Sequence, residues 1–129
     1  MNIEKIFRNL LLADFLSLIL VIISSAVDGS YSNNNVETFP DAILPEPFIL
    51  TTFLGYIIIY PIILFLLYRF NSFGKLTYLP LTIVILTISA LAGTTTLSGL
   101  TNLLGGIGMM LSGSILTMLY FTEIKDKFD

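Results

Sequence analysis

Residues 57–67 read IIIYPIILFLL and lie at the centre of a longer apolar segment, Phe48–Tyr68. A helix needs about 20 mostly apolar residues to cross the hydrocarbon core of a bilayer, and this segment has that length. A membrane β-strand would alternate apolar and polar residues over about ten positions, which this stretch does not do. Since lipid cannot satisfy exposed backbone polar groups, the segment is predicted to be a transmembrane helix.

Three further segments share this length and composition: Phe7–Val27, Tyr78–Leu97 and Leu103–Phe121. The whole chain agrees, because 55% of its 129 residues are apolar and only 12% are charged. A soluble fold of this size could not bury so much apolar surface. We therefore predict an all-α chain with one domain, residues 1–129, which forms an integral membrane antiparallel four-helix bundle in the lipid bilayer.

The basic residues predict how the bundle is oriented, since short cytoplasmic loops retain Lys and Arg. All six lie at the chain ends or between the second and third spans: Lys5, Arg8, Arg69, Lys75, Lys125 and Lys127. The connection Asp28–Pro47 holds four carboxylates and no basic residue, and Ser98–Asn102 is uncharged. We predict N-in/C-in topology, with both termini cytoplasmic and residues 28–47 forming a solvated outer loop that lacks the spacing of a calcium site.

The N-terminal segment has an alternative interpretation. Lys5 and Arg8, the apolar stretch after them and the small residues 24–26 also resemble a secretory signal peptide with its cleavage site. Asp14 argues against this, because it places a charge inside what would be the apolar region of the signal. Cleavage would leave three spans with the new N-terminus outside.

Several function classes are excluded by what the chain lacks. It has no Cys and no His, which removes thiolate chemistry, the commonest catalytic base and the two commonest transition-metal ligands. Its formal net charge of −3 does not fit a basic nucleic-acid-binding surface. One Asp within the spans is too few for intramembrane proteolysis by paired aspartates. We expect no enzymatic activity, no catalytic residue, no cofactor, no metal and no nucleic-acid partner.

Small residues of the last span predict how helices pack, because helices in lipid associate where small side chains allow close approach. At about 100° per residue they form two adjacent stripes: Gly105, Gly108 and Ser112 on one, and Gly106, Gly113 and Thr117 on the other. We expect this side to contact another helix of the bundle. The alternative is a partner chain, either a second copy in a homo-oligomer or a different membrane protein.

Asp14 is the one ionisable residue well inside a span, if Tyr is set aside. A carboxylate at the centre of a membrane helix costs roughly 2.5–3.5 kcal/mol on insertion scales, so it is a functional hypothesis by default. Counting 1.5 Å per residue inward from the charged ends places Thr82 and Thr117 near its depth. A protonated carboxyl could donate to either hydroxyl in a proton or cation site. The competing interpretation is a wetted or purely structural hydrogen-bonding residue.

The second span offers a further candidate pocket or hinge, formed by Tyr56, Tyr60 and Pro61. Pro61 removes a backbone donor, which predicts a kink and a free carbonyl at Ile57 near the middle of the membrane. A proline of this kind can also serve packing alone, because neighbouring helices satisfy the freed carbonyl.

The C-terminal segment 115–128, ILTMLYFTEIKDKF, resembles the end of small four-span bacterial inner-membrane proteins of uncharacterised function. In those proteins a last span rich in small residues runs into an aromatic pair and a short Lys-containing tail that ends in Phe. The resemblance extends in outline to the whole chain, including the acidic, proline-containing outer loop. It implies a location in the bacterial inner membrane and carries no activity.

The chain is also similar to small multidrug-resistance transporters in its length, its four spans and the single acidic residue of its first span. Asp14 stands where their acid is Glu, the chain has no Trp, and its basic-residue bias opposes the dual topology of their antiparallel dimers. Two functions therefore stay open. We expect a non-enzymatic structural or interaction subunit of a membrane, and the alternative is a small proton- or cation-coupled transporter that uses Asp14.

Overall fold

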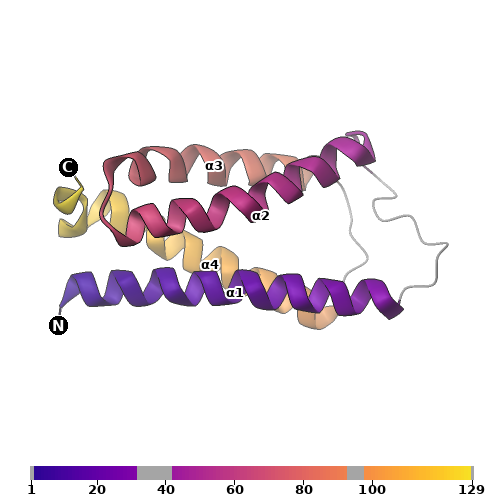
Figure 1. The fold of residues 1–129 in the computed structure, drawn as a ribbon, viewed down its shortest axis with the longest axis horizontal. Helices are drawn as coiled ribbons and strands as arrows, with labels where there is room; N and C mark the ends of the chain where they lie inside the picture. Colours follow the sequence, from indigo (N-terminus) through magenta and orange to yellow (C-terminus); the bar gives the residue numbers. More distant parts are fainter. Residues whose placement is uncertain (1, 32–41, 93–97, 129) are drawn as a thin grey trace.

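The computed structural model describes residues 2–31, 42–92 and 98–128, and these residues are almost entirely helical. Five helices follow one another along this part of the chain: α1 (Ile3–Tyr31), α2 (Glu46–Tyr68), α3 (Ser72–Leu91), α4 (Gly99–Phe121) and the short 3-10 helix η1 (Glu123–Lys127) (Figure 1). Each of α1 to α4 is long and apolar enough to cross a membrane. The all-α class and the presence of four candidate spans are thus confirmed.

The starts of α3 and α4 differ from the predicted span limits because capping side chains set them. Asn71 caps α3, its side-chain oxygen accepting a hydrogen bond from Phe73 N at 2.9 Å, so α3 begins at Ser72 instead of Tyr78. Ser98 caps α4 in the same way, so the expected Ser98–Asn102 connection is largely the first turn of a helix. These caps lie outside the apolar runs from which the spans were predicted.

Helix α1 begins at Ile3, four residues before its predicted start, and two further limits shift at the side opposite the termini. Helix α1 continues to Tyr31 and α2 begins at Glu46, so both helices extend into the expected outer loop, residues 28–47. The middle of the expected outer loop, residues 32–41, lies outside the described residues, as does the expected end of the third span at Leu97.

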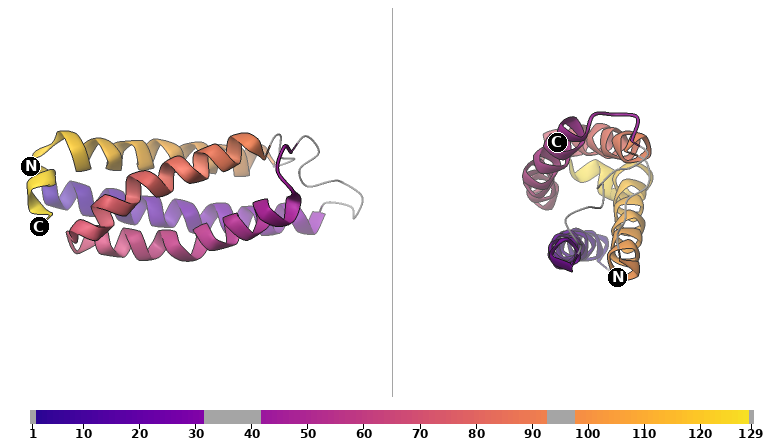
Figure 2. Two further views of the ribbon diagram at one scale, coloured as in Figure 1. Left: turned by 90° about the horizontal axis from the view of Figure 1, so that it is seen from above. Right: turned by 90° about the vertical axis from the view of Figure 1, so that its right-hand side faces the viewer.

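The long helices are arranged as two pairs. Helix α4 packs most extensively against α1, α3 packs against α2, and α1 also contacts α2. Figures 1 and 2 show the four helices lying lengthwise, with α1 and α3 leading away from the end that holds both termini and α2 and α4 leading back to it. The first and last long helices of the chain therefore form one pair, and the middle two form the other.

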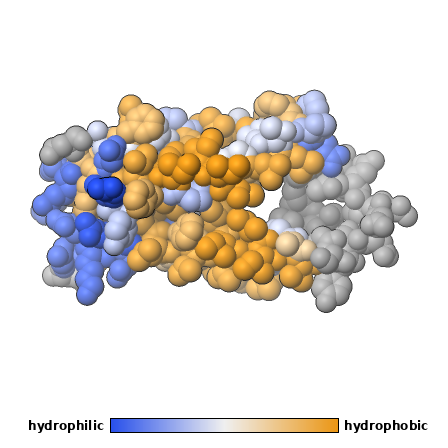
Figure 3. Space-filling view, viewed as in Figure 1, coloured by the Kyte–Doolittle hydropathy of each residue, from blue (hydrophilic) through white to orange (hydrophobic). Residues whose placement is uncertain are grey.

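The outer surface of the helices is apolar. Large side chains remain exposed on each helix, such as Leu16 on α1, Ile58 on α2 and Met110 on α4. Figure 3 shows an apolar belt along the helices, with hydrophilic residues gathered at the end that carries the termini. Exposed hydroxyls on this surface, including those of Thr87 and Ser114, donate to the backbone carbonyl four residues earlier in their own helix. Such a surface is suited to lipid, where each polar group needs an internal partner.

The α2–α3 hairpin turns through a residue with positive φ. Phe70 has φ of 55°, and Phe70 N and Asn71 N donate to the carbonyls of Leu67 and Leu66 at 2.9 and 3.0 Å. This is the Schellman pattern of helix termination, in which glycine usually holds the left-handed position. The Phe70 ring contacts those of Phe7 and Phe128, with centroids 5.9 and 5.4 Å away. These contacts offset the strain of a bulky residue in that conformation.

The C-terminal tail closes the end of the molecule that carries the termini. Ile124 in η1 is fully buried, and Lys127 forms an ion pair with Glu4 of α1 at 3.1 Å. Lys75 Nζ of α3 donates to the backbone carbonyl of Lys125 at 2.9 Å. The tail therefore joins α1 to α3 at this end.

Gly74 allows the close approach of α2 and α3, so a substitution at this position tests the packing. A Cβ atom at this position would lie 2.9 Å from Leu66 Cβ and 3.0 Å from Leu67 N, a backbone atom that cannot yield without moving the helix. We expect Gly74→Ala to lower the free energy of unfolding in detergent by about 1–3 kcal/mol. The matched control is Gly55→Ala on α2, where no described neighbour lies within 4 Å of the added atom. Equal stability of the two variants would contradict the described packing.

Candidate functional site

Small and polar residues form the part of the α1–α4 contact that lies away from the termini. Ser24 and Thr101 hydroxyls lie 2.5 Å apart, and Ser17 Oγ donates to the Leu104 carbonyl at 3.4 Å. A Cβ at Gly108 would lie only 3.1 Å from Ser17 Oγ, so the glycine leaves room for the serine. Hydrogen bonds and close approach, which hold helices together in lipid, therefore act along this part of the contact.

This contact leads to a buried cluster of four polar side chains, one from each long helix: Asp14 (α1), Tyr60 (α2), Tyr78 (α3) and Ser112 (α4). Asp14 and Tyr60 are each 3% exposed, and Tyr78 is fully buried. Residues this far apart in the chain meet only when both helix pairs are assembled. The cluster is therefore the place where the two pairs are joined by side-chain hydrogen bonds.

The carboxylate of Asp14 is the acceptor at the centre of the cluster. Tyr60 OH donates to Oδ2, and Ser112 Oγ donates to Oδ1 at 3.3 Å. The Tyr60 and Tyr78 hydroxyls lie 3.2 Å apart, and Tyr60 OH lies 3.1 Å from Ser112 Oγ. Since the one proton of Tyr60 is used toward Asp14, its oxygen is free to accept from Tyr78.

This arrangement can accommodate a proton. An ionised carboxylate only accepts hydrogen bonds, whereas a protonated one also donates, and hydroxyl groups can reverse their role by rotating. Gain or loss of a proton at Asp14 would therefore need rotation of the Tyr60 or Ser112 hydroxyl and no movement of a helix.

A cavity of about 480 Å³ lies beside the cluster, between the two helix pairs. All four long helices contribute to its wall, and most of the wall is apolar. The polar wall residues are few: Asp14, Ser17, Tyr56, Tyr60, Thr82, Ser89 and Ser112. An apolar chamber with a small number of grouped polar side chains has the features of a small-molecule site.

The predicted threonine partners of Asp14 take other positions. Thr82 lines the cavity, but its hydroxyl donates to the Tyr78 carbonyl at 2.8 Å. Thr117 is exposed, and its hydroxyl donates to the Gly113 carbonyl at 2.9 Å. The expected hydrogen bonds from Asp14 to these two hydroxyls are therefore not formed. Counting residues gave approximate depth along each helix, and it did not give the face that each helix turns toward Asp14.

The three residues of the predicted α2 pocket line two different cavities. Tyr56 and Tyr60 line the cavity with their rings stacked, centroids 4.7 Å apart. Pro61 lies inside the continuous helix α2 and faces a second, apolar groove. Pro61 is thus brought close to α1 and not to the polar cluster.

The two small-residue stripes of α4 also have different surroundings. Gly108 and Ser112 of the first stripe face α1. At Gly105, Gly106 and Gly113 a Cβ atom would have no described neighbour within 4 Å beyond its own helix. Only part of the small side of α4 is therefore used in contacts among the described residues.

Tyr78 is the cluster member that the sequence did not indicate. It lay at the expected start of the third span, where an interfacial tyrosine is ordinary. Because α3 begins at Ser72, Tyr78 lies nearly two turns inside the helix. A possible signal was the Asn71 cap, which would have placed Tyr78 deeper in the span.

Among the described residues, no group of three or more His, Cys, Asp or Glu side chains could hold a metal ion. Comparison with known proteins gives no lead on the site, since no family model, curated protein or solved structure matches the chain. The function must be inferred from the geometry of the cluster and the cavity.

Proposed function

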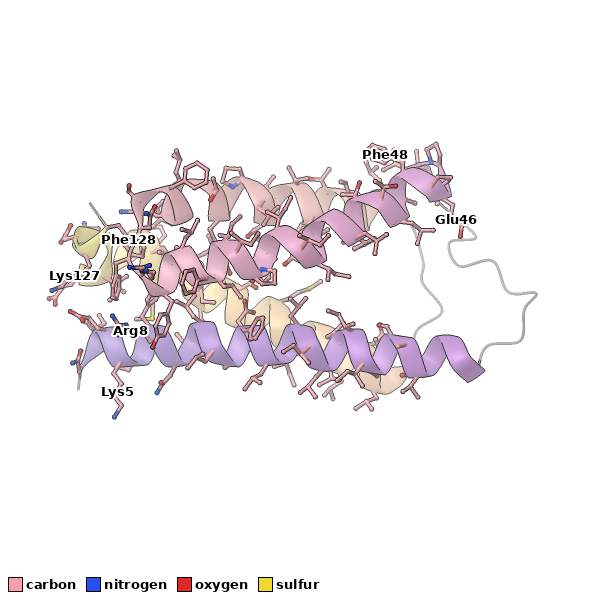
Figure 4. All side chains as sticks on the ribbon, in the orientation of Figure 1. Lys5, Arg8, Glu46, Phe48, Lys127 and Phe128 are labelled. Carbon is pink, nitrogen blue, oxygen red and sulfur yellow. The ribbon has the colours of Figure 1, made fainter. Side chains whose placement is uncertain are left out.

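We propose that the four helices span the bacterial inner membrane as an antiparallel bundle with both termini in the cytoplasm. The charges support this orientation. Lys75 donates to the tail at Lys125, Lys127 pairs with Glu4, and Arg8 packs on Phe70, so basic residues from separate segments gather at one end. Figure 4 shows Glu46 at the opposite end of α2 from these residues. The inner-membrane location is supported by the resemblance of the C-terminal segment.

The proposed orientation can be tested with single cysteines, because the chain has none of its own. We expect Lys5→Cys and Lys125→Cys to react with a membrane-impermeant maleimide only in inside-out vesicles. Ile43→Cys, at an exposed position beyond the other end of the helices, should react only in intact spheroplasts. Labelling of Lys5→Cys and Lys125→Cys from opposite sides would contradict the shared location of the termini.

We propose that the chain is a small proton- or cation-coupled transporter. The observation that carries this proposal is the burial of Asp14 in the wall of the 480 Å³ cavity, with hydrogen bonds from two other helices. An acid placed only to join helices would need no chamber beside it. Here the acid, two stacked tyrosines and the chamber coincide in the region between the helix pairs.

Coupling would follow from competition for one carboxylate. A proton and a cationic substrate cannot both be held by Asp14, because each neutralises the same buried charge. Binding of one would release the other, and the hydroxyls of Tyr60 and Ser112 would reorient to suit the new charge state. The two helix pairs could then open on alternate sides of the cluster.

Asp14→Asn tests the coupling. The amide can accept from Tyr60 and donate to Ser112, so the fold should persist, but it cannot exchange a proton. In proteoliposomes with an internal pH dye and an imposed pH gradient, small amines, Na⁺ and K⁺ would be added in turn. We expect at least one to drive proton movement with the unaltered chain, and the rate with Asp14→Asn to fall to that of protein-free vesicles.

The matched control is Asp126→Asn, which removes the same charge from the exposed tail and should transport at the unaltered rate. Proton movement by Asp14→Asn at the unaltered rate would sink the transport proposal, as would the absence of any response from the unaltered chain. Failure of Asp14→Asn to fold would assign the acid a structural role.

A second candidate is a structural or interaction subunit that associates through α4. The observation that favours it is the open set of glycines, since Gly106 and Gly113 are exposed and lie two turns apart with no described neighbour within 4 Å of a Cβ. Small residues of this kind allow two membrane helices to approach closely. The occupant would be a second copy of the chain or a different membrane protein.

For this candidate we expect Gly106→Leu with Gly113→Leu to dissolve a complex that is isolated in native-lipid nanodiscs. Added side chains would hold the partner helix away. The number and identity of copies would be read by mass spectrometry. The control is Ile107→Leu, an exposed bulky position of α4 about 100° around the helix from Gly106, whose replacement should leave the complex intact. Recovery of the unaltered chain alone would remove this candidate.

A further inference from the structure

A second cavity, of about 320 Å³, lies between α1 and α2 away from the polar cluster. Its wall is entirely apolar apart from one tyrosine hydroxyl: Leu11, Leu12, Phe15, Pro61, Leu64, Phe65 and Tyr68. Leu12, Phe15 and Phe65 are among the exposed apolar side chains of the structure, so the groove opens to the surface of the bundle. It plays no part in the proposed transport site.

Two arginines stand at the end of this groove. Arg8 Cζ lies 4.9 Å from the ring centre of Tyr68, and Arg69 Cζ lies 5.9 Å from that of Phe65. Both rings belong to the groove wall. The wall residues of α1 follow Arg8 by three, four and seven positions, so they continue its face of the helix inward for about 10 Å. The groove therefore begins at two positive charges and extends toward the middle of the membrane.

Among the described residues, neither arginine has a partner of opposite charge. The one ion pair in this part of the chain joins Lys127 to Glu4, so the acid one turn before Arg8 is already engaged. Arg8 Nε is buried without a hydrogen-bond partner, although a guanidinium carries five donors. The Tyr68 and Phe70 rings hold the group in place by cation–π contact. Such an oriented guanidinium with unused donors is suited to an oxyanion, above all a phosphate.

We propose that this groove binds an anionic phospholipid, with the phosphate at Arg8 and Arg69 and one acyl chain between α1 and α2. Both the positive charge of the arginines and the apolar shape of the groove fit this occupant. A soluble phosphate would use the arginines and leave the apolar groove uncovered, whereas a neutral lipid would fill the groove and leave the guanidinium donors unpaired. Figure 4 shows Arg8 on the side of α1 that faces α2 and Lys5 on the opposite side, so the two basic residues of this helix end have different roles.

The test compares phosphatidylglycerol with phosphatidylcholine on the whole purified chain in detergent, with bound lipid counted by native mass spectrometry. We expect one phosphatidylglycerol to bind in preference to phosphatidylcholine. Arg8→Gln with Arg69→Gln should weaken its binding by about tenfold or more, because each basic residue near a charged headgroup contributes about fivefold. The matched control, Lys5→Gln with Lys125→Gln, removes the same charge from the same end and should change binding by less than about twofold.

A second variant tests the groove apart from the charges. Leu12→Trp would fill the groove from its exposed side and should weaken phosphatidylglycerol binding with both arginines in place. The melting temperature of each variant without lipid serves as a check on folding. Equal binding of the two lipids by the unaltered chain would overturn the proposal, as would equal losses in the arginine and lysine double variants. Displacement of the lipid by an equal concentration of inorganic phosphate would show a headgroup-only site and would also overturn it.

Discussion

The hydrogen bonds to the Asp14 carboxylate are the interaction on which the assembly of the two helix pairs depends. Apolar side chains give helices little reason to associate in lipid, because acyl chains are an equally good environment for them. What remains is close packing and polar pairing. Tyr60 reaches Asp14 from the α2–α3 pair and Ser112 reaches it from α4, so one acceptor joins three helices. Burial of the Asp14 carboxylate is unfavourable unless it is hydrogen-bonded, and the groups that satisfy it also hold these three helices together.

Asp14, Tyr60 and Ser112 of this cluster also line the larger cavity, and these two roles explain why the partners of the acid are hydroxyl groups. Hydroxyl groups can donate or accept, so they continue to satisfy the carboxyl whether it is charged or neutral. A lysine or arginine in place of Tyr60 would hold Asp14 in one charge state. Hydroxyl partners can keep the helix pairs joined in both protonation states of Asp14. A proton-coupled transporter requires an acid that can gain and lose its proton in this way.

Much of the fold could be predicted from the sequence, because membrane helices are marked by long apolar runs. The candidate site was predictable in part. Asp14 was identified from its position inside a span, and Tyr60 and Ser112 were each singled out for other reasons. Their meeting was not predicted, since periodicity defines a helix face and not the neighbour to which the face turns. Tyr78 was missed because the Asn71 cap starts α3 earlier than its apolar run suggests.

The pairing of α1 with α4 also determines the order in which helix contacts can form during synthesis. Chains are made at roughly 5–20 residues per second, so α1 enters the membrane several seconds before α4 has been translated. The α2–α3 hairpin can close in that interval, because its close approach at Gly74 is local in the chain. Ser17 and Ser24 must wait for α4 to supply their partners. A chain that is interrupted before α4 therefore exposes the polar face of α1 to lipid.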